Sequence, residues 1–362
     1  MIDSALPAAV DAALVTFFDA RRPSPDRVAP EFTEAVGELE AFVLRGGKRM
    51  RPSFAWWGWR GAKGAAEGPA ATAALHACAA LELIQACALV HDDLMDASDT
   101  RRGHPAVHRA FADQHRAQHW NGDPERYGLA AAILLGDLAL AWADDMFRTA
   151  VFRTAGLQSG AADRAAQVWE QMRTELMGGQ LLDVLTEHRG DESPAAALRT
   201  ARFKTAAYTV EHPLCLGAAM AGAAPAVEEA YARYGANVGV AFQLRDDLLG
   251  VFGDPSVTGK PAGDDVREGK RTLLMALALE TADEKDRAAA SALRRALGRN
   301  LDPDDVDEVR AHLVRLGAVG AVEQRITDLT RRGLSALDEV ALDPDARAAL
   351  QAMATAATKR TF

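Results

Sequence analysis

The sequence predicts an all-α fold, and three observations support that prediction. Apolar residues recur at helical spacing over long segments, whereas the alternation typical of a half-buried strand never extends over a useful length. The breaks between these segments are short and rich in glycine or proline, and none resembles a linker between domains. With 362 residues, 49% of them hydrophobic, the chain is long enough to bury a large core. We therefore expect one helical domain over residues 1–362.

The expected helices follow one another along the chain. Residues 70–95 form the longest apolar segment, and a helix that is apolar nearly all round is a buried one. We therefore expect this segment to be a central helix. The remaining expected helices cover residues 130–150, 162–185, 195–221, 226–251, 272–280, 286–297, 303–316 and 318–337.

Composition argues against several functional classes. A formal net charge of −10 disfavours nonspecific binding to nucleic acid. The three cysteines lack metal-ligand spacing and are typical of reduced thiols in a cytoplasmic protein. The first twenty residues lack the basic and apolar regions of a signal peptide, and no uncharged apolar run of about 18 residues occurs. We therefore expect a cytoplasmic protein with no membrane span.

Three aspartates lie at the end of the expected central helix. Asp92, Asp93 and Asp96 occur in the segment VHDDLMD, and the spacing of four puts Asp92 and Asp96 on one helical face. Such carboxylates repel one another unless a cation neutralises them. Hard oxygen ligands suit Mg²⁺, which proteins usually share with substrate phosphates. Arg101 and Arg102 follow closely and would hold phosphate oxygens that the metal leaves free.

A second acidic pair occurs far downstream. Asp246 and Asp247 lie in the segment FQLRDD, and two glycine–lysine pairs follow, ending in Lys260 and Lys270. Together the two acidic clusters predict that a diphosphate is clamped between two acidic walls.

Four further segments fit a diphosphate ligand. They are GGKRMRP at 46–52, ELIQ ending at Gln85, GGQLLD at 178–183 and FKT at 203–205. Lysine is scarce, because the 41 basic residues include only 7 lysines. Four of these lysines lie in the segments singled out here: Lys48, Lys204, Lys260 and Lys270.

The ordered series of these motifs resembles the trans-isoprenyl diphosphate synthases, also called polyprenyl synthetases, over about residues 46–274. A single DDxxD motif would be weak evidence, whereas the whole series is highly specific. The resemblance implies the isoprenoid synthase fold, an antiparallel helical bundle around a central active-site cavity, and a homodimer. It also implies that isopentenyl diphosphate and an allylic diphosphate are the substrates.

In the implied reaction, the allylic C–O bond ionises, the alkene of isopentenyl diphosphate attacks the cation, and a proton is lost. Three Mg²⁺ ions and cationic side chains would stabilise the leaving diphosphate. A dry apolar cavity would protect the cation from water.

The same resemblance assigns the residues. Direct metal ligands are Asp92, Asp96 and Asp246, and their supporting or water-mediated partners are Asp93 and Asp247. The allylic diphosphate is held by Arg101, Lys204 and Lys260. Isopentenyl diphosphate is held by Lys48, Arg51, Gln85 and Arg102. The cation is stabilised by the dipoles of Thr205 and Gln243, and Lys270 helps to close the site.

One position departs from the family pattern. The second cluster usually ends in an aspartate at its fifth position, where this chain has Gly250. Asp254 lies two turns after Asp247 and is a candidate for water-mediated support. Because Asp246 is the one residue of the second cluster that is expected to touch metal directly, we expect activity to survive.

Product length is predicted from the helix that carries Asp92. Residues one and two turns before the cluster would line the tunnel for the growing tail, and a facing helix would add Trp142. These wall residues are Ala80, Leu81, Ile84, Cys87 and Ala88. Because the first turn is small and one helical turn of about 5.4 Å matches one isoprene unit, we expect geranylgeranyl diphosphate (C20). Farnesyl and C25–C35 products remain alternatives.

Other functional classes share some of these sequence features. A class I terpene cyclase would share the first cluster but would not need Lys48, Arg51 and Arg102. A non-catalytic subunit of a heteromeric synthase is supported by Gly250 alone. A zinc site would use the i, i+4 histidines of residues 104–119, where no third ligand type converges.

Overall fold

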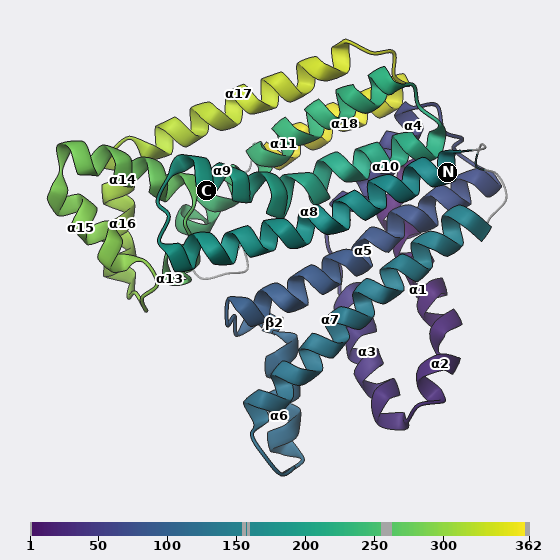
Figure 1. Cartoon of the computed structure of the whole chain (residues 1–362), viewed down its shortest axis with the longest axis horizontal. Coiled ribbons are helices and arrows are strands. Elements are labelled where there is room, and N and C mark those ends of the chain that lie inside the picture. Colours follow the sequence, from purple (N-terminus) through teal and green to yellow (C-terminus); the bar gives the residue numbers. More distant parts are fainter. Residues whose placement is uncertain (1, 154–156, 158–159, 255–262, 359–362) are drawn as a thin grey trace. The chain divides into compact units, whose positions relative to one another are not determined.

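The computed structural model describes residues 2–153, 157, 160–254 and 263–358 (Figure 1). Helices dominate this part of the chain, which confirms the predicted all-α class. The chain forms two compact units. Unit 1 comprises residues 1–167 and 216–223, and unit 2 comprises residues 168–215 and 224–362. The single domain expected from the sequence stays a prediction.

Unit 1 contains the first half of the expected motifs. Its elements are the 3₁₀ helix η1 (Asp3–Ala5), α1 (Leu6–Arg21), α2 (Pro23–Asp26), α3 (Pro30–Leu44), α4 (Met50–Gly61), α5 (Pro69–Met95), β1 (Thr100–Arg101), β2 (His104–Pro105), α6 (Val107–Ala117), α7 (Pro124–Arg148) and the π-helical η2 (Thr149–Arg153). The two strands pair antiparallel and form a tight hairpin after α5.

Helix α5 is the core helix of unit 1, as predicted. It begins with a proline in its first turn, where the missing N–H costs no hydrogen bond. Seventeen of its residues are buried, including Leu81 and Ile84. Among the described residues it is the one helix long and apolar enough to cross a membrane. However, 78% of its most apolar window is buried, as in the core helix of a folded protein.

Helix α7 packs closely against α5. Gly136 of α7 faces His91 of α5, and a Cβ at that glycine would overlap the imidazole ring. The ring Nε2 lies 3.3 Å from the carbonyl oxygen of Ile133. A small residue on α7 therefore allows the imidazole next to Asp92 to sit between the two helices.

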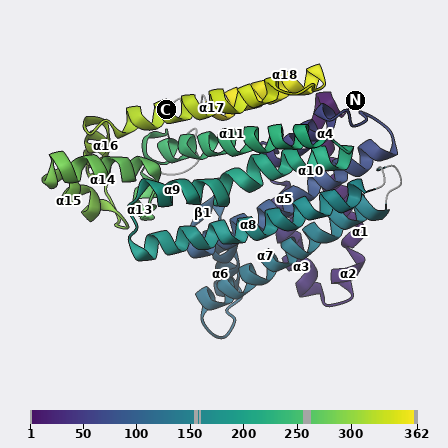
Figure 2. The ribbon, with the colours of Figure 1, turned by 45° about the horizontal axis from the view of Figure 1, so that its top comes forward.

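Unit 2 contains the remaining helices. They are most of α8 (Ala161–Arg189), α9 (Pro194–Thr200), the π-helical η3 (Ala201–Glu211), the start of α10 (His212–Ala221), α11 (Pro225–Phe252), α13 (Asp264–Arg267), α14 (Leu273–Lys285), α15 (Arg287–Ala296), α16 (Pro303–Arg315), α17 (Ala318–Asp338) and α18 (Pro344–Thr358). Helix α11 lies beside α17 and α18 (Figure 2). The helix predicted over residues 195–221 is observed as the consecutive elements α9, η3 and α10, of which residues 201–211 are π-helical.

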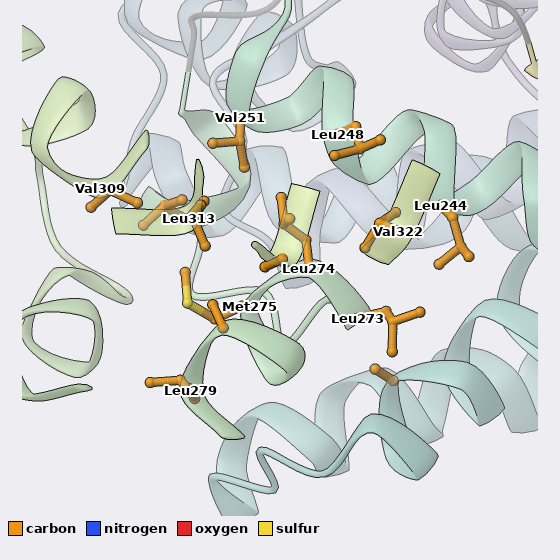
Figure 3. Packing of buried hydrophobic residues seen from close by; sticks show 14 of the residues in the cluster. Leu244, Leu248, Val251, Leu273, Leu274, Met275, Leu279, Val309, Leu313 and Val322 are labelled. Atoms are coloured by element: carbon orange, nitrogen blue, oxygen red, sulfur yellow. The ribbon is translucent and has the colours of Figure 1, made fainter. Parts of the chain in front are cut away.

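The core of unit 2 surrounds the C-terminal half of α11. Leu244, Leu248 and Val251 pack with side chains of α14, α16 and α17 (Figure 3). Burial of each such side chain contributes about 1.5–3 kcal/mol. This packing fixes the rotation of α11 and therefore the direction in which Asp246 and Asp247 project.

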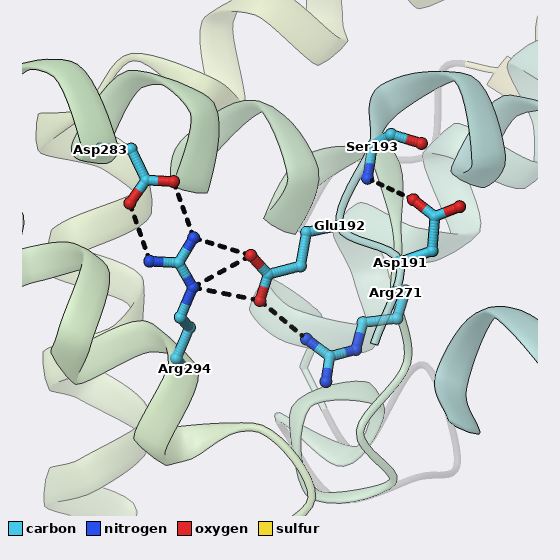
Figure 4. Close-up of polar contacts among 6 residues, drawn as sticks. All are labelled: Asp191, Glu192, Ser193, Arg271, Asp283 and Arg294. Carbon is cyan, nitrogen blue, oxygen red and sulfur yellow. Dashed lines mark hydrogen bonds and ion pairs between the residues drawn. The ribbon is translucent and has the colours of Figure 1, made fainter. Parts of the chain in front are cut away.

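A polar network holds the loop after α8 against α14 and α15 (Figure 4). Arg294 donates to Glu192 and to Asp283 at distances of 2.7 to 3.2 Å. Glu192 also accepts from Arg271 at 3.3 Å. Several charges share these contacts, so the network is worth more than an isolated surface pair. It anchors Arg271, which follows Lys270 directly.

Candidate active site

Four arginines of unit 1 gather near the start of α4 and the hairpin after α5. Arg102 has a left-handed backbone (φ 54°) in the hairpin turn, and its Nη1 donates to the carbonyl oxygen of Gly46 at 2.6 Å. Burial and the charges of Arg49, Arg101 and Arg51 lower the pKa of Arg102, whereas the charge of Glu82 opposes this shift. Of these four arginines, Arg51 and Arg102 were predicted to hold isopentenyl diphosphate, whereas Arg101 was predicted to hold the allylic diphosphate and Arg49 had no predicted role. Such a group favours an anionic ligand.

The other predicted members of this pocket lie on the neighbouring elements. Lys48 is exposed just before α4, and Arg51 is half-buried in its first turn. Gln85 is buried on α5, two turns before Asp92. All these residues belong to unit 1.

The first aspartate cluster lies at the C-terminal end of α5. Asp93 is fully buried, whereas Asp92 and Asp96 are half-buried. A helix C-terminus carries partial negative charge, so three carboxylates there repel both one another and the helix dipole. This placement becomes favourable when a divalent cation binds, so the donor set fits Mg²⁺.

Arg101 is positioned by the hairpin directly beside this cluster. Its Nε donates to Asp93 Oδ1 at 2.8 Å, its Nη2 contacts the same oxygen, and Asp92 Oδ2 lies 3.6 Å away. Arg101, which was predicted to hold diphosphate, is therefore also paired with two aspartates that were predicted to bind or support the metal. This contact neutralises Asp93 and holds it in place.

In unit 2, the structure brings the GGQLLD and FKT motifs together. Lys204 Nζ lies 2.5 Å from Asp183 Oδ2. A Cβ at Gly179 would overlap the backbone of Phe203 and Lys204, so this glycine lets α8 approach η3 closely. Thr205 is half-buried next to Lys204. Sequence reasoning missed the pairing of Asp183 with Lys204, although both motifs had been singled out.

The second aspartate pair lies near the end of α11. Asp246 is exposed, whereas Asp247 is buried and accepts a 2.6 Å hydrogen bond from Gln243 Nε2. Burial, followed by the charges of Asp265 and Asp246, raises the pKa of Asp247 well above its ordinary value. Clustered carboxylates of this kind also fit a divalent cation.

Gly250 has a carboxylate directly beside it. A Cβ at this position would overlap Asp265 Oδ2, and the segment is held by a 3.1 Å bond from Gly263 N to Gly250 O. Lys270 Nζ lies 3.7 Å from Asp265 and 2.5 Å from Glu268. Asp265 was not singled out from the sequence, where Asp254 was considered instead. The sequence signal that could have indicated it is the acidic pair Asp264–Asp265, which lies between the two glycine–lysine pairs.

Comparison with known proteins identifies the family. A family model described as polyprenyl synthetase matches residues 34–313. The chain belongs to the polyprenyl synthetase family. It is therefore a prenyltransferase of the trans-isoprenyl diphosphate synthase class, as the motif series indicated.

Individual relatives support this membership over nearly the whole chain. A crystal structure of geranylgeranyl pyrophosphate synthase from Corynebacterium glutamicum, complexed with isoprenyl diphosphate and magnesium, is 48% identical. The match covers 98% of each chain with a TM-score of 0.93. The geranylfarnesyl diphosphate synthase of Aeropyrum pernix is 32% identical over 325 residues, covering 90% of this chain and 91% of that protein. The geranylgeranyl diphosphate synthase of Mycobacterium tuberculosis is 35% identical over 271 residues, covering 74% and 69%.

These similarities confirm the predicted isoprenoid synthase fold as a helical bundle. The relatives are named for products of different lengths. A (2E,6E)-farnesyl diphosphate synthase from Mycobacterium bovis is a further example, 32% identical over 271 residues. Family membership therefore establishes the reaction class and leaves the product length open.

The described ranges contain no group of three or more histidine, cysteine, aspartate or glutamate side chains that could hold a metal ion by itself. His115 of α6, one of the histidines weighed for zinc, instead contacts the carbonyl oxygen of Asn121 at 3.2 Å and the ring of Tyr127. Mg²⁺ commonly binds through one or two carboxylates plus substrate phosphates, so it does not need a complete protein cage. Lys260, predicted to hold the allylic diphosphate, lies outside the described residues.

Proposed function

We propose that this polyprenyl synthetase is a Mg²⁺-dependent enzyme that condenses isopentenyl diphosphate with an allylic diphosphate to give geranylgeranyl diphosphate. The observation that carries the proposal is the juxtaposition in unit 1 of the Asp92–Asp96 cluster with the arginines around Arg102. Carboxylates that fit a divalent cation and cations that fit phosphate are what a metal-bound diphosphate requires.

Each group of residues has a proposed part. The metal ions are held by Asp92, Asp93, Asp96, Asp246 and Asp247. Isopentenyl diphosphate is held by Lys48, Arg51, Gln85 and Arg102. The allylic diphosphate and cation are bound by Arg101, Lys204, Lys260, Thr205 and Gln243, and Lys270 closes the site. The bound metal would stabilise the charge that develops on the leaving diphosphate.

The contacts of Lys204 and Arg101 fit these parts. Each cation pairs with an aspartate, Lys204 with Asp183 and Arg101 with Asp93. An ion pair holds a long side chain in one orientation before substrate arrives, which reduces the entropy lost on binding. The cations are therefore preorganised for phosphate.

The C20 assignment rests on the buried wall of α5. Ile84 is fully buried and Cys87 is 1% exposed, with its Sγ 3.7 Å from His91 Nδ1. Burial raises the pKa of Cys87 to about 12, so this side chain stays a neutral thiol with a small apolar surface. Because Cys87, one turn before Asp92, is small, we propose that it does not block a C15 tail.

A direct assay tests the proposal. The protein is incubated with labelled isopentenyl diphosphate, an allylic primer and MgCl₂, and the dephosphorylated products are separated by chromatography. We expect a C20 alcohol, and no product when EDTA is added. A C15 or C25–C35 alcohol would correct the length, whereas a cyclic hydrocarbon or no product would refute chain elongation. Cys87→Phe should shorten the product.

We also propose that the protein is a homodimer. Three large apolar side chains of α7 are exposed, namely Leu129 at 43%, Ile133 at 49% and Leu134 at 68%. A cluster of exposed apolar residues on one helix is typical of an interface. Light scattering should give twice the chain mass, and Leu134→Glu should weaken the dimer. Val314→Glu, at a valine of α16 that is 58% exposed, is the control and should leave the dimer unchanged.

A further inference from the structure

Arg49 lies between two residues of the proposed isopentenyl diphosphate pocket but points away from solvent. Its side chain is 2% exposed, and all three guanidinium nitrogens are used. Nη1 donates to Glu82 Oε2 at 2.6 Å, Nε to Asp11 Oδ1 at 2.8 Å and Nη2 to the carbonyl oxygen of Val43 at 2.9 Å. Arg49 therefore links the start of α4 to α1, α3 and α5.

The backbone of Arg49 is unusual as well. Its φ of 46° is in the left-handed region, which residues other than glycine rarely adopt unless their surroundings hold them there. The Arg49 carbonyl accepts from Ser53 N at 3.0 Å and from Ser53 Oγ at 2.7 Å, so α4 starts at this residue. This strained turn sets the direction of Lys48 on one side and of Arg51 on the other.

Glu82 completes the arrangement from α5. It is 6% exposed and lies three residues before Gln85, so the two side chains leave neighbouring positions of the helix. Its negative charge also favours the charged form of Arg102, whose side chain donates to the carbonyl oxygen of Gly46. One buried carboxylate is thus coupled to both segments that present cations.

We propose that Arg49 and Glu82 are a positioning pair that holds Lys48, Arg51 and Gln85 in the arrangement that binds isopentenyl diphosphate. The pair itself is not expected to touch the substrate, because both side chains are buried and each guanidinium nitrogen of Arg49 has a protein acceptor. Residues that orient ligating groups commonly change affinity about 10–100-fold when replaced. This inference rests on the proposed function of the pocket.

The test compares Arg49→Lys and Glu82→Gln with the parent enzyme. Lysine keeps the charge but cannot reach three acceptors, and glutamine keeps the shape but removes the charge. Each variant should raise the calorimetric Kd and the KM for isopentenyl diphosphate by about tenfold or more. The KM of the allylic substrate should change less than about twofold. The double variant should be no worse than the poorer single variant, as expected for a coupled pair.

Arg60→Ala is the matched control. Arg60 is also on α4, and it ties that helix to Asp3 at 3.3 Å, but at the end away from the pocket. It should leave the Kd for isopentenyl diphosphate unchanged. If Arg49→Lys does not fold, Asp11→Ala removes one Arg49 acceptor at a position that is 47% exposed, and it should still raise the Kd for isopentenyl diphosphate.

Arg51→Ala separates this inference from the proposed function. If Arg51→Ala weakens the binding of isopentenyl diphosphate but the folded Arg49 and Glu82 variants do not, the positioning role is refuted. The assignment of the pocket is then retained. If Arg51→Ala also leaves binding unchanged, the pocket assignment itself fails. Equal weakening of both substrates by the Arg49 and Glu82 variants would likewise overturn the positioning role.

Discussion

At the scale of single residues, two glycines determine what lies next to the acidic clusters. Gly136 leaves room for His91, the residue before Asp92, and Gly250 leaves room for Asp265. In each case the glycine lies on one helix, and a side chain from another helix occupies the space where a Cβ would be. Substitution at these glycines therefore acts on the neighbouring functional residues.

Gly136→Ala should lower both stability and turnover. The added methyl group would overlap the His91 ring, and overpacking of this kind costs about 1–3 kcal/mol. Urea unfolding measures the first effect and initial rates the second. Gly320→Ala, in α17 with nothing near its Cβ, is the control and should be neutral or slightly stabilising. Equal stability of Gly136→Ala and the parent protein would contradict the packing argument.

Gly250→Asp should lower activity, even though it restores the family's usual fifth-position aspartate. The new side chain would displace Asp265, whose carboxylate already occupies that space. We expect a loss of about tenfold in rate at low Mg²⁺, comparable to other changes around metal ligands. Adding Asp265→Gly to the same chain should restore part of the rate. A fully active Gly250→Asp single variant would show that the two carboxylates do not compete.

At the scale of elements, the π-helical η3 brings a buried polar cluster against α8 and α10. Glu211 pairs with Arg202 within η3, while His212 Nε2 lies 2.9 Å from Glu175 Oε2 of α8. Burial, with a smaller effect of Glu175, raises the pKa of Glu211 to about 7, although Arg202 opposes the shift. Burial also lowers the pKa of His212. This cluster should therefore make stability depend on pH near neutrality.

Glu211→Gln should isolate one part of that dependence. Since the pKa of Glu211 is raised in the folded state, its contribution to stability is fully present below about pH 4.5 and is lost as pH rises through about 7. The variant should therefore gain about 1–3 kcal/mol relative to the parent between pH 5 and pH 8. His212 acts in the opposite direction, because its contribution is lost as pH falls below about 6.5.

Urea unfolding across this pH range measures the difference. Glu284→Gln, at an exposed position of α14, should leave the pH profile unchanged and serves as the control. A constant difference between Glu211→Gln and the parent protein would mean that Glu211 does not titrate in this window.

At the scale of the whole molecule, predicted metal ligands occur in unit 1 and in unit 2, and each can be tested by itself. Asp92→Ala in unit 1 and Asp246→Ala in unit 2 should each lower turnover by about 10²-fold or more, because each removes a proposed ligand of the metal that stabilises the leaving group. Circular dichroism should show intact helices in both. Asp304→Ala, in the first turn of α16, is the control. Near-normal turnover in either metal-ligand variant would refute that assignment.

Helix positions were largely predictable because they depend on neighbours in the sequence. The helix expected over residues 70–95 is observed as Pro69–Met95, and the one expected over 226–251 as Pro225–Phe252. Apolar periodicity is a local property and survives without knowledge of packing. Helices α1, α3, α4, α6 and α18 lie outside the predicted ranges. In α4 the apolar residues and glycines show no clear periodicity. The π-helical form of residues 201–211 was also not evident from the pattern.

The residue types of the candidate site were also set by the sequence, since the order and spacing of acids, lysines and arginines determine which ligand chemistry is possible. Their partners were decided by the tertiary structure alone. Lys204 meets Asp183, Arg49 meets Glu82, and Asp265 occupies the space at Gly250. These contacts join different elements, so their distances depend on how helices pack and rotate. Periodicity determines which face of a helix is apolar, whereas close packing determines which distant side chain that helix meets.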